Sequence, residues 1–164
     1  MQIAKFKVKE KSLVFTLFLV LGIVLPLLKI QLVVGTLINA LLFLSVMYFG
    51  LKQTIIIGLI PSLISLAVGF LPFFIAPFVP FIMAGNLLLA VLFAFLQNQK
   101  YLVRALLAAL AKGLFLCGAA YVLSFYLSSE QALAVSSIFG LVQLATAFFG
   151  AGLAYVVLRF KPAL

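Results

Sequence analysis

Apolar residues fill long, nearly uninterrupted stretches of the chain, and charges or Pro and Gly clusters separate one stretch from the next. A bilayer core about 30 Å thick needs roughly 20 apolar helical residues for each crossing. Strands of a membrane β-barrel would instead alternate over about ten residues. We therefore expect an all-α integral membrane bundle, one transmembrane domain over residues 1–164, with six helices near residues 12–28, 31–49, 53–71, 77–96, 101–127 and 131–160.

The composition fits a chain surrounded by lipid and removes most enzyme classes. Residues of the types AVILMFWYC make up 68% of the chain and charged residues 8%, against roughly 45–50% and 25% in typical soluble domains. The sequence has no His, 2 Asp or Glu residues and 1 Cys. Metal centres and acid–base catalysis draw on these residue types. We expect no metal centre, no cofactor and no conventional enzymatic activity.

The basic residues predict the orientation. If the N-terminus is cytoplasmic, only Lys29 falls on the outer side. The inner segments then carry Lys5, Lys7, Lys9, Lys11, Lys52, Lys100, Arg104, Arg159 and Lys161. The positive-inside rule favours this arrangement, with both termini cytoplasmic, and it agrees with an even number of spans. The net charge of +9 is thereby explained without nucleic acid, which we do not expect as a partner.

Two segments leave alternatives open. The N-terminal lysines followed by an apolar stretch resemble a signal peptide, but no small-residue cleavage site follows, so we expect a retained first helix. Residues 70–80 are apolar and aromatic, yet they contain Pro72, Pro77 and Pro80. This segment is either an aromatic belt at the membrane interface or a lid over the outer mouth of the bundle.

Strong polar groups near the middle of the membrane carry most of the functional signal. At about 1.5 Å per residue, Asn39 and Asn86 lie about 13 Å, and Gln143 about 18 Å, from the outer ends of their spans. Lys112 lies about 16 Å from the inner end of the fifth span. For Asn and Gln the alternative is hydrogen bonding between helices. The four together are the candidate binding site for a small solute.

Lys112 is the most unusual of these residues, because a lysine at mid-span costs about 2.5–3.5 kcal/mol on insertion scales. The sequence offers no carboxylate within the membrane to pair with it. Its side chain either reaches towards the inner headgroups, caps the carbonyls of a broken helix, or meets an anionic group on a bound molecule. Carriers driven by protons or sodium keep a carboxylate in the membrane, so energy for uptake would have to come from another subunit.

Small residues at helical spacing predict where helices approach closely, because helices in lipid associate through such positions. The third span carries a seam of this kind, and the last span has several pairs four residues apart. These positions are Gly58, Ser62, Ser65 and Gly69 in the third span, and Ser136, Gly140, Ala147, Gly150, Ala151 and Ala154 in the last.

The central part of the chain, from Gly35 to Gln97, resembles the substrate-binding S components of energy-coupling-factor (ECF) transporters. The likeness is carried by Gly35-Thr36-Leu37-Ile38-Asn39-Ala40, Gly50, Gly58, Pro61, Gly69, Leu71-Pro72, Pro77-Phe78-Val79-Pro80-Phe81 and Gly85-Asn86. One difference lies in the first span, where Ser12 and Thr16 stand at the spacing of an Ala-xxx-Ala pattern that many members carry.

This resemblance implies a small six-helix protein of the bacterial cytoplasmic membrane, with both termini inside, that binds a vitamin, precursor or other micronutrient near the outer face. Its implied partners are a transmembrane coupling subunit and a pair of ATPases. A different class has similar size and span count, namely a membrane scaffold such as the small rod-shape-determining protein. A scaffold of that kind predicts no internal polar pocket.

Overall fold

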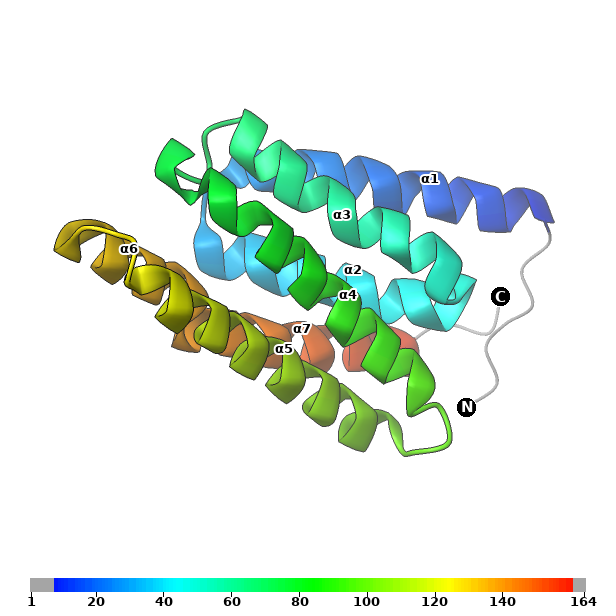
Figure 1. Cartoon of the computed structure of the whole chain (residues 1–164). Coiled ribbons are helices and arrows are strands. Elements are labelled where there is room, and N and C mark those ends of the chain that lie inside the picture. The colour runs from blue at the N-terminus through cyan, green and yellow to red at the C-terminus, as the bar shows by residue number, and fades with distance from the viewer. Residues whose placement is uncertain (1–7, 161–164) are drawn as a thin grey trace.

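The computed structural model describes residues 8–160, and within this range all regular elements are helices (Figure 1). Three of the basic residues expected on the inner side lie outside the described residues, namely Lys5, Lys7 and Lys161. In chain order the elements are α1 (Val8–Val24), η1 (Leu25–Leu28), α2 (Gln31–Phe49), α3 (Leu51–Ala67), η2 (Phe73–Phe78), α4 (Val79–Phe95), α5 (Tyr101–Ser124), α6 (Ser129–Phe139) and α7 (Leu141–Arg159).

Five helical stretches are long and apolar enough to cross a membrane. They are Lys9–Leu28, Gln31–Phe49, Phe73–Phe95, Tyr101–Ser124 and Ser129–Arg159. The third expected span appears as the shorter apolar helix α3, which has 17 residues. The expected all-helical membrane architecture is therefore confirmed for the described residues at this level.

The last expected span differs from the structure, because it is broken at Gly140 into α6 and α7. Gly140 has φ −79° and ψ −131°, which leaves the helical region. A Cβ at this position would lie 2.6 Å from the carbonyl oxygen of Ser136, so only glycine fits the bend. Gly140 thus marks the break between two helices, whereas the small-residue pattern predicted it on a continuous packing face.

The bundle is built around α2, which lies between α1 and α3 on one side and α4 and α7 on the other (Figure 1). Its most extensive contact is with α7. There Gly150 of α7 lies against the backbone of α2, and Gly35 of α2 lies against Thr146. Ala147 and Ala154 are fully buried on the same face of α7, so the expected packing role of these small residues is confirmed.

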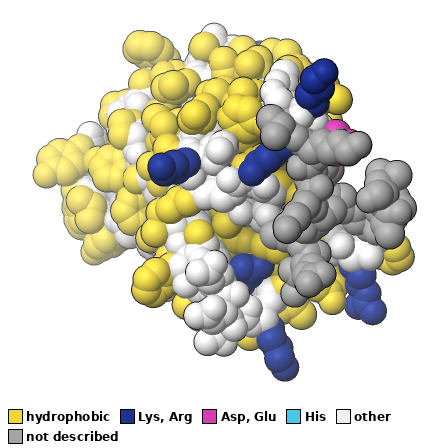
Figure 2. All heavy atoms as spheres, turned by 90° about the vertical axis from the view of Figure 1, so that its right-hand side faces the viewer, with side chains coloured by type: hydrophobic (Ala, Val, Ile, Leu, Met, Phe, Trp, Pro, Cys, Tyr) yellow, Lys and Arg dark blue, Asp and Glu magenta, His cyan; other side chains and the backbone are white. Residues whose placement is uncertain are grey.

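The outer surface is largely apolar, as expected for contact with lipid. Leu13, Leu114 and Phe149, for example, are each more than half exposed. Exposed basic side chains gather at the end of the bundle where α1 begins and α7 ends, which Figure 2 views directly. They include Lys9, Lys11, Lys52, Lys100 and Arg159. We call this end the basic end; the opposite end carries η1, η2 and the start of α6 (Figure 1).

Candidate functional site

Lys112 lies in the interior of the bundle and holds two asparagines from neighbouring helices. Its Nζ donates hydrogen bonds to Oδ1 of Asn39 in α2, at 2.6 Å, and to Oδ1 of Asn86 in α4, at 2.7 Å. The three side chains are 2%, 1% and 3% exposed. Lys112 therefore does not reach towards the headgroups, and it caps no broken helix. Three of the four residues expected to form a site are in direct contact.

The two asparagine amides extend this cluster to two further helices. Asn39 Nδ2 donates to the carbonyl oxygen of Gly35 at 2.8 Å and to Oγ1 of Thr146 in α7 at 3.3 Å. Asn86 Nδ2 donates to the carbonyl oxygen of Gly58 in α3 at 2.9 Å. Both amides are thereby oriented with their oxygen atoms towards the ammonium group.

The contact with Gly58 depends on the local sequence of α3. Pro61 has no N–H group and cannot bond the carbonyl four residues earlier, so the turn around it is disturbed. Gly58 carries no side chain, and its Cα lies close enough to α4 that an added Cβ would be 3.6 Å from Cβ of Asn86. The carbonyl that Pro61 leaves without a helical donor is that of Ile57, and the missing side chain of Gly58 lets the Asn86 amide reach the neighbouring Gly58 carbonyl.

A cavity of about 60 Å³ lies beside Lys112. All four expected residues line it, together with side chains from α2, α3, α4 and the segment before η2. The lining residues include Gln31, Asn39, Ser62, Phe70, Leu71, Ile82, Asn86, Lys112 and Gln143. Gln31 is the first residue of α2, and Asn39 is about 12 Å further along that helix. The cavity thus extends from the end opposite the basic end to the middle of the bundle.

Several polar groups remain available to an occupant of this cavity. An ammonium group has three N–H donors, and the Asn39 and Asn86 oxygens take two of those of Lys112. Within the part of the chain that the structure describes, the Gln143 amide and the Ser62 hydroxyl have no hydrogen-bond partner, although both line the cavity. The lining includes no carboxylate. This chemistry suits a small molecule with an anionic or strongly accepting group.

The size of the cavity limits its occupant. Pockets for small organic ligands have volumes of about 300–1,000 Å³, whereas this one has about 60 Å³. That space holds water molecules, and a larger ligand requires the wall to move. Residues Phe70 and Leu71, which precede η2, form part of the wall.

The η2 segment covers the end of the bundle at which the cavity lies. Ile75 and Phe78 are 0% and 2% exposed and pack against the cluster formed by Leu116, Val135 and Phe139 of α5 and α6. Phe73 points outwards and is 87% exposed. The buried half of the segment thus packs against α5 and α6, and of residues 70–80 only Phe70 and Leu71 line the cavity.

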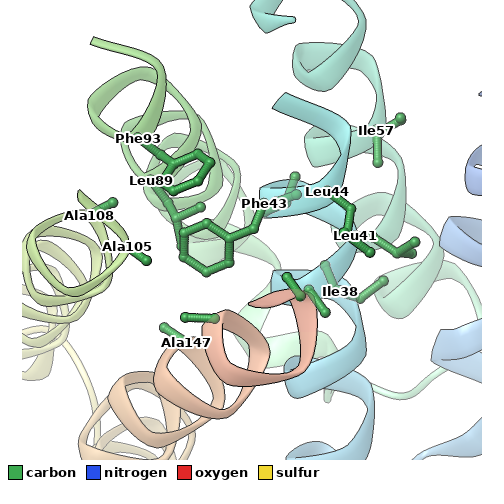
Figure 3. Close-up of a cluster of buried hydrophobic side chains, with 14 of the residues drawn as sticks. Ile38, Leu41, Phe43, Leu44, Ile57, Leu89, Phe93, Ala105, Ala108 and Ala147 are labelled. Atoms are coloured by element: carbon green, nitrogen blue, oxygen red, sulfur yellow. The ribbon is translucent and has the colours of Figure 1, made fainter. Parts of the chain in front are cut away.

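Aromatic and aliphatic side chains close the cavity towards the basic end. Phe43, one turn beyond Asn39 in α2, packs edge-on against Phe93 of α4, with 4.9 Å between the ring centroids. Leu89 and the alanines of α5 complete this floor (Figure 3). Phe43, Leu89 and Phe93 are all 0% exposed. Among the described residues, these side chains close the pocket at the end that faces the basic end.

Replacement of Phe43 by Ala should lower the free energy of unfolding by about 3 kcal/mol, mainly through the cavity left in the floor. Lipid does not fill this cavity, because the Phe43 side chain contacts only protein. The measurement is unfolding by SDS in mixed micelles, followed by far-UV circular dichroism. Phe95→Ala is the matched control, because Phe95 is 80% exposed on α4. Equal effects of the two substitutions would contradict the role of Phe43 as a sealed floor residue.

Sequence reasoning missed Thr146 and Ser62 as parts of the site. Thr146 is 0% exposed, and its Oγ1 donates to the carbonyl oxygen of Gln143 at 3.0 Å while it accepts from Asn39. Ser62 was expected only as a small packing residue. A signal was present in both cases, because each hydroxyl lies on the helix face that carries the small residues.

In the described range, residues 8–160, no three His, Cys, Asp or Glu side chains gather in a possible metal site. The chemistry of the cavity therefore rests on ammonium, amide and hydroxyl groups. No protein-family model, curated protein or solved structure matches the chain.

Proposed function

We propose that this protein is the substrate-binding membrane subunit of an ATP-driven importer of the ECF type, with a small anionic micronutrient as its solute. The observation that carries the proposal is Lys112, whose ammonium lies in a cavity with two asparagine partners and an unused donor. A fixed cation held away from bulk solvent attracts a carboxylate or phosphate group more strongly than one at the surface. The resemblance of residues 35–97 to S components supplies the transporter class.

The proposal includes six membrane crossings with both termini in the cytoplasm of a bacterium. In support, α3 has 17 residues, which is at the lower limit of about 17–25 residues for a spanning helix. The basic residues at one end of the bundle are those that the positive-inside rule places in the cytoplasm. The cavity then lies towards the outer face, where a solute would arrive.

The floor of the cavity and the absence of carboxylates in its lining bear on the transport mechanism. Because Phe43 and Phe93 close the route towards the basic end, release into the cytoplasm requires a rearrangement of the bundle. No carboxylate in the cavity is available to bind a coupling ion. We therefore assign the energy supply to partner subunits, a membrane coupling protein and two ATPases.

The alternative of a rod-shape scaffold is less well supported. A scaffold acts through its outer faces and has no use for a polar cavity that contains a lysine. The cost of placing a lysine in the membrane interior favours a binding role for it.

The first experiment identifies any small molecule that remains with the purified full-length protein, by mass spectrometry of the denatured sample. Affinity for that molecule is then measured for the wild type and for Lys112→Met by thermal stabilisation. Removing one partner of a buried charged contact costs about 2 kcal/mol or more, so we expect binding to weaken at least about thirtyfold. Lys52→Met, which removes an exposed charge at the basic end, should leave affinity unchanged.

Two outcomes would contradict the proposal in different ways. Unchanged affinity in Lys112→Met would remove the anion assignment and leave the transporter class intact. Co-purification of the tagged protein with cell-wall synthesis proteins, and not with a coupling subunit and ATPases, would instead favour the scaffold.

A further inference from the structure

Arg104 is buried near the basic end, and the described residues give it no anionic partner. The residue is 9% exposed, although the positive-inside count treats it only as an orienting charge. Its Nη2 lies 2.6 Å from the thioether sulfur of Met47, which is a weak acceptor. Its Cζ lies 4.2 Å from the ring centroid of Phe93. Nε is buried, with no hydrogen-bond partner in the described part of the chain.

No carboxylate in residues 8–160 pairs with Arg104, and a buried guanidinium without an anion is costly. The cation–π contact with Phe93 offsets part of this cost. It leaves several N–H donors of the guanidinium unused. Unused donors on a buried cation are typical of a site that binds an anion from outside the chain.

A second cavity lies beside Arg104 and has a volume of about 500 Å³. Lys100, Gln97 and Gln99 line it from the turn between α4 and α5. The helix α5 begins at this point, with Lys100 as its N-cap and no side chain that caps its first N–H groups. The cavity thus combines two cations, two amides and the positive end of a 24-residue helix.

We propose that this cavity binds a phosphate anion. Arginine matches the geometry of phosphate oxygens through paired N–H donors, and lysine adds a point charge. Arg104 lies about 6 Å along α5 from Lys100, at the boundary between the apolar bundle and its exposed basic end. The phosphate is carried either by the headgroup of an anionic phospholipid or by a free phosphate ion.

This site is separate from the Lys112 cavity and does not depend on the proposed transport function. The ring of Phe93 lies between the two, because it contacts Phe43 in the floor and Arg104 beyond it. The two cavities therefore open towards opposite ends of the bundle.

The test uses the full-length protein in a maltoside detergent and has two arms. In the first arm, phosphatidylglycerol is added and its retention is measured by native mass spectrometry, with phosphatidylcholine as the reference lipid. In the second arm, inorganic phosphate is titrated, and the unfolding temperature is followed by circular dichroism. Both arms compare the wild type with Arg104→Gln, Lys100→Gln and the control Lys52→Gln.

Loss of one charged contact should weaken phosphatidylglycerol binding roughly tenfold in Arg104→Gln and Lys100→Gln, and Lys52→Gln should behave as the wild type. If this holds and inorganic phosphate has no effect, the source is the lipid headgroup. Stabilisation by inorganic phosphate that is lost in both variants identifies the free ion. Lys100 is exposed at the helix start, so its variant decides the result if Arg104→Gln does not fold.

Equal retention of phosphatidylglycerol in all variants, with no response to phosphate, would overturn the proposal. Binding that is lost equally in Lys52→Gln would do the same, because it would show only a diffuse charge effect. A carboxylate on a protein partner would then be the remaining source of an anion for Arg104.

Discussion

Gly150→Ala should lower the free energy of unfolding by about 3 kcal/mol, which is at the upper end for overpacking by one methyl group. A Cβ at Gly150 would lie 2.6 Å from Cβ of Asn39, 2.8 Å from the carbonyl oxygen of Thr36 and 2.9 Å from the backbone nitrogen of Ala40. Two of these atoms belong to the backbone and cannot move aside. The methyl group therefore forces α7 away from α2, the helix with which it makes its largest contact.

The matched control for this prediction lies in the same helix. Gly152 has nothing within 4 Å of an added Cβ, so Gly152→Ala should be neutral or stabilising by up to about 1 kcal/mol through helix propensity. Both variants are unfolded by SDS in mixed micelles and followed by far-UV circular dichroism. Equal stabilities would show that α2 and α7 are not packed at this distance. Because Asn39 faces Gly150, Gly150→Ala should also weaken binding in the Lys112 cavity.

Asn86→Leu should have an effect of similar size, for an electrostatic reason. The leucine removes one of the two acceptors of Lys112 and leaves a buried ammonium incompletely paired, which costs about 3 kcal/mol. Leucine has the same branched arrangement of side-chain heavy atoms as asparagine, so the substitution changes polarity more than shape. The same unfolding measurement applies, and Asn98→Leu is the control, because Asn98 is exposed in the turn after α4.

The decisive comparison is the double variant Asn86→Leu/Lys112→Met. The second substitution removes the incompletely paired charge but leaves Oδ1 of Asn39 without its donor, so we expect the double variant to be about 1–2 kcal/mol more stable than Asn86→Leu alone and still less stable than the wild type. If the double variant were no more stable than Asn86→Leu alone, the charge of Lys112 would not be the source of the loss. Such a result would also weaken the case for an ammonium group in the cavity.

The depth of polar residues along the chain was enough to predict the central cluster. Short links make neighbouring helices antiparallel, so residues at equal depth in α2, α4 and α5 lie near one another in a small bundle. Asn39, Asn86 and Lys112 follow this rule and are in contact. Gln143 lines the same cavity without touching the lysine. Their proximity was predictable because these four side chains are strongly polar in an otherwise apolar interior, and their role in binding a solute stays a prediction.

Other features depend on how the helices are rotated and packed. The hydropathy pattern carries no information on either. The burial of Arg104 requires that α5 turn this residue towards Phe93, and a count of charges at span ends cannot show that rotation. The break at Gly140 depends on a backbone conformation rather than on composition. The volume of the Lys112 cavity is set by how closely α2, α3 and α4 approach, and a pattern of residue types gives no such distance.

The helix α5 carries both buried cations, Lys112 and Arg104, which lie about 12 Å apart along its axis. It has 24 residues and no proline, so it behaves as a stiff rod over this distance. A shift of α5 along its axis would therefore move both charges together. Such a movement would change both cavities at once. Any coupling between the two ends would be reciprocal, because thermodynamic linkage requires each anion to change the affinity for the other by the same factor.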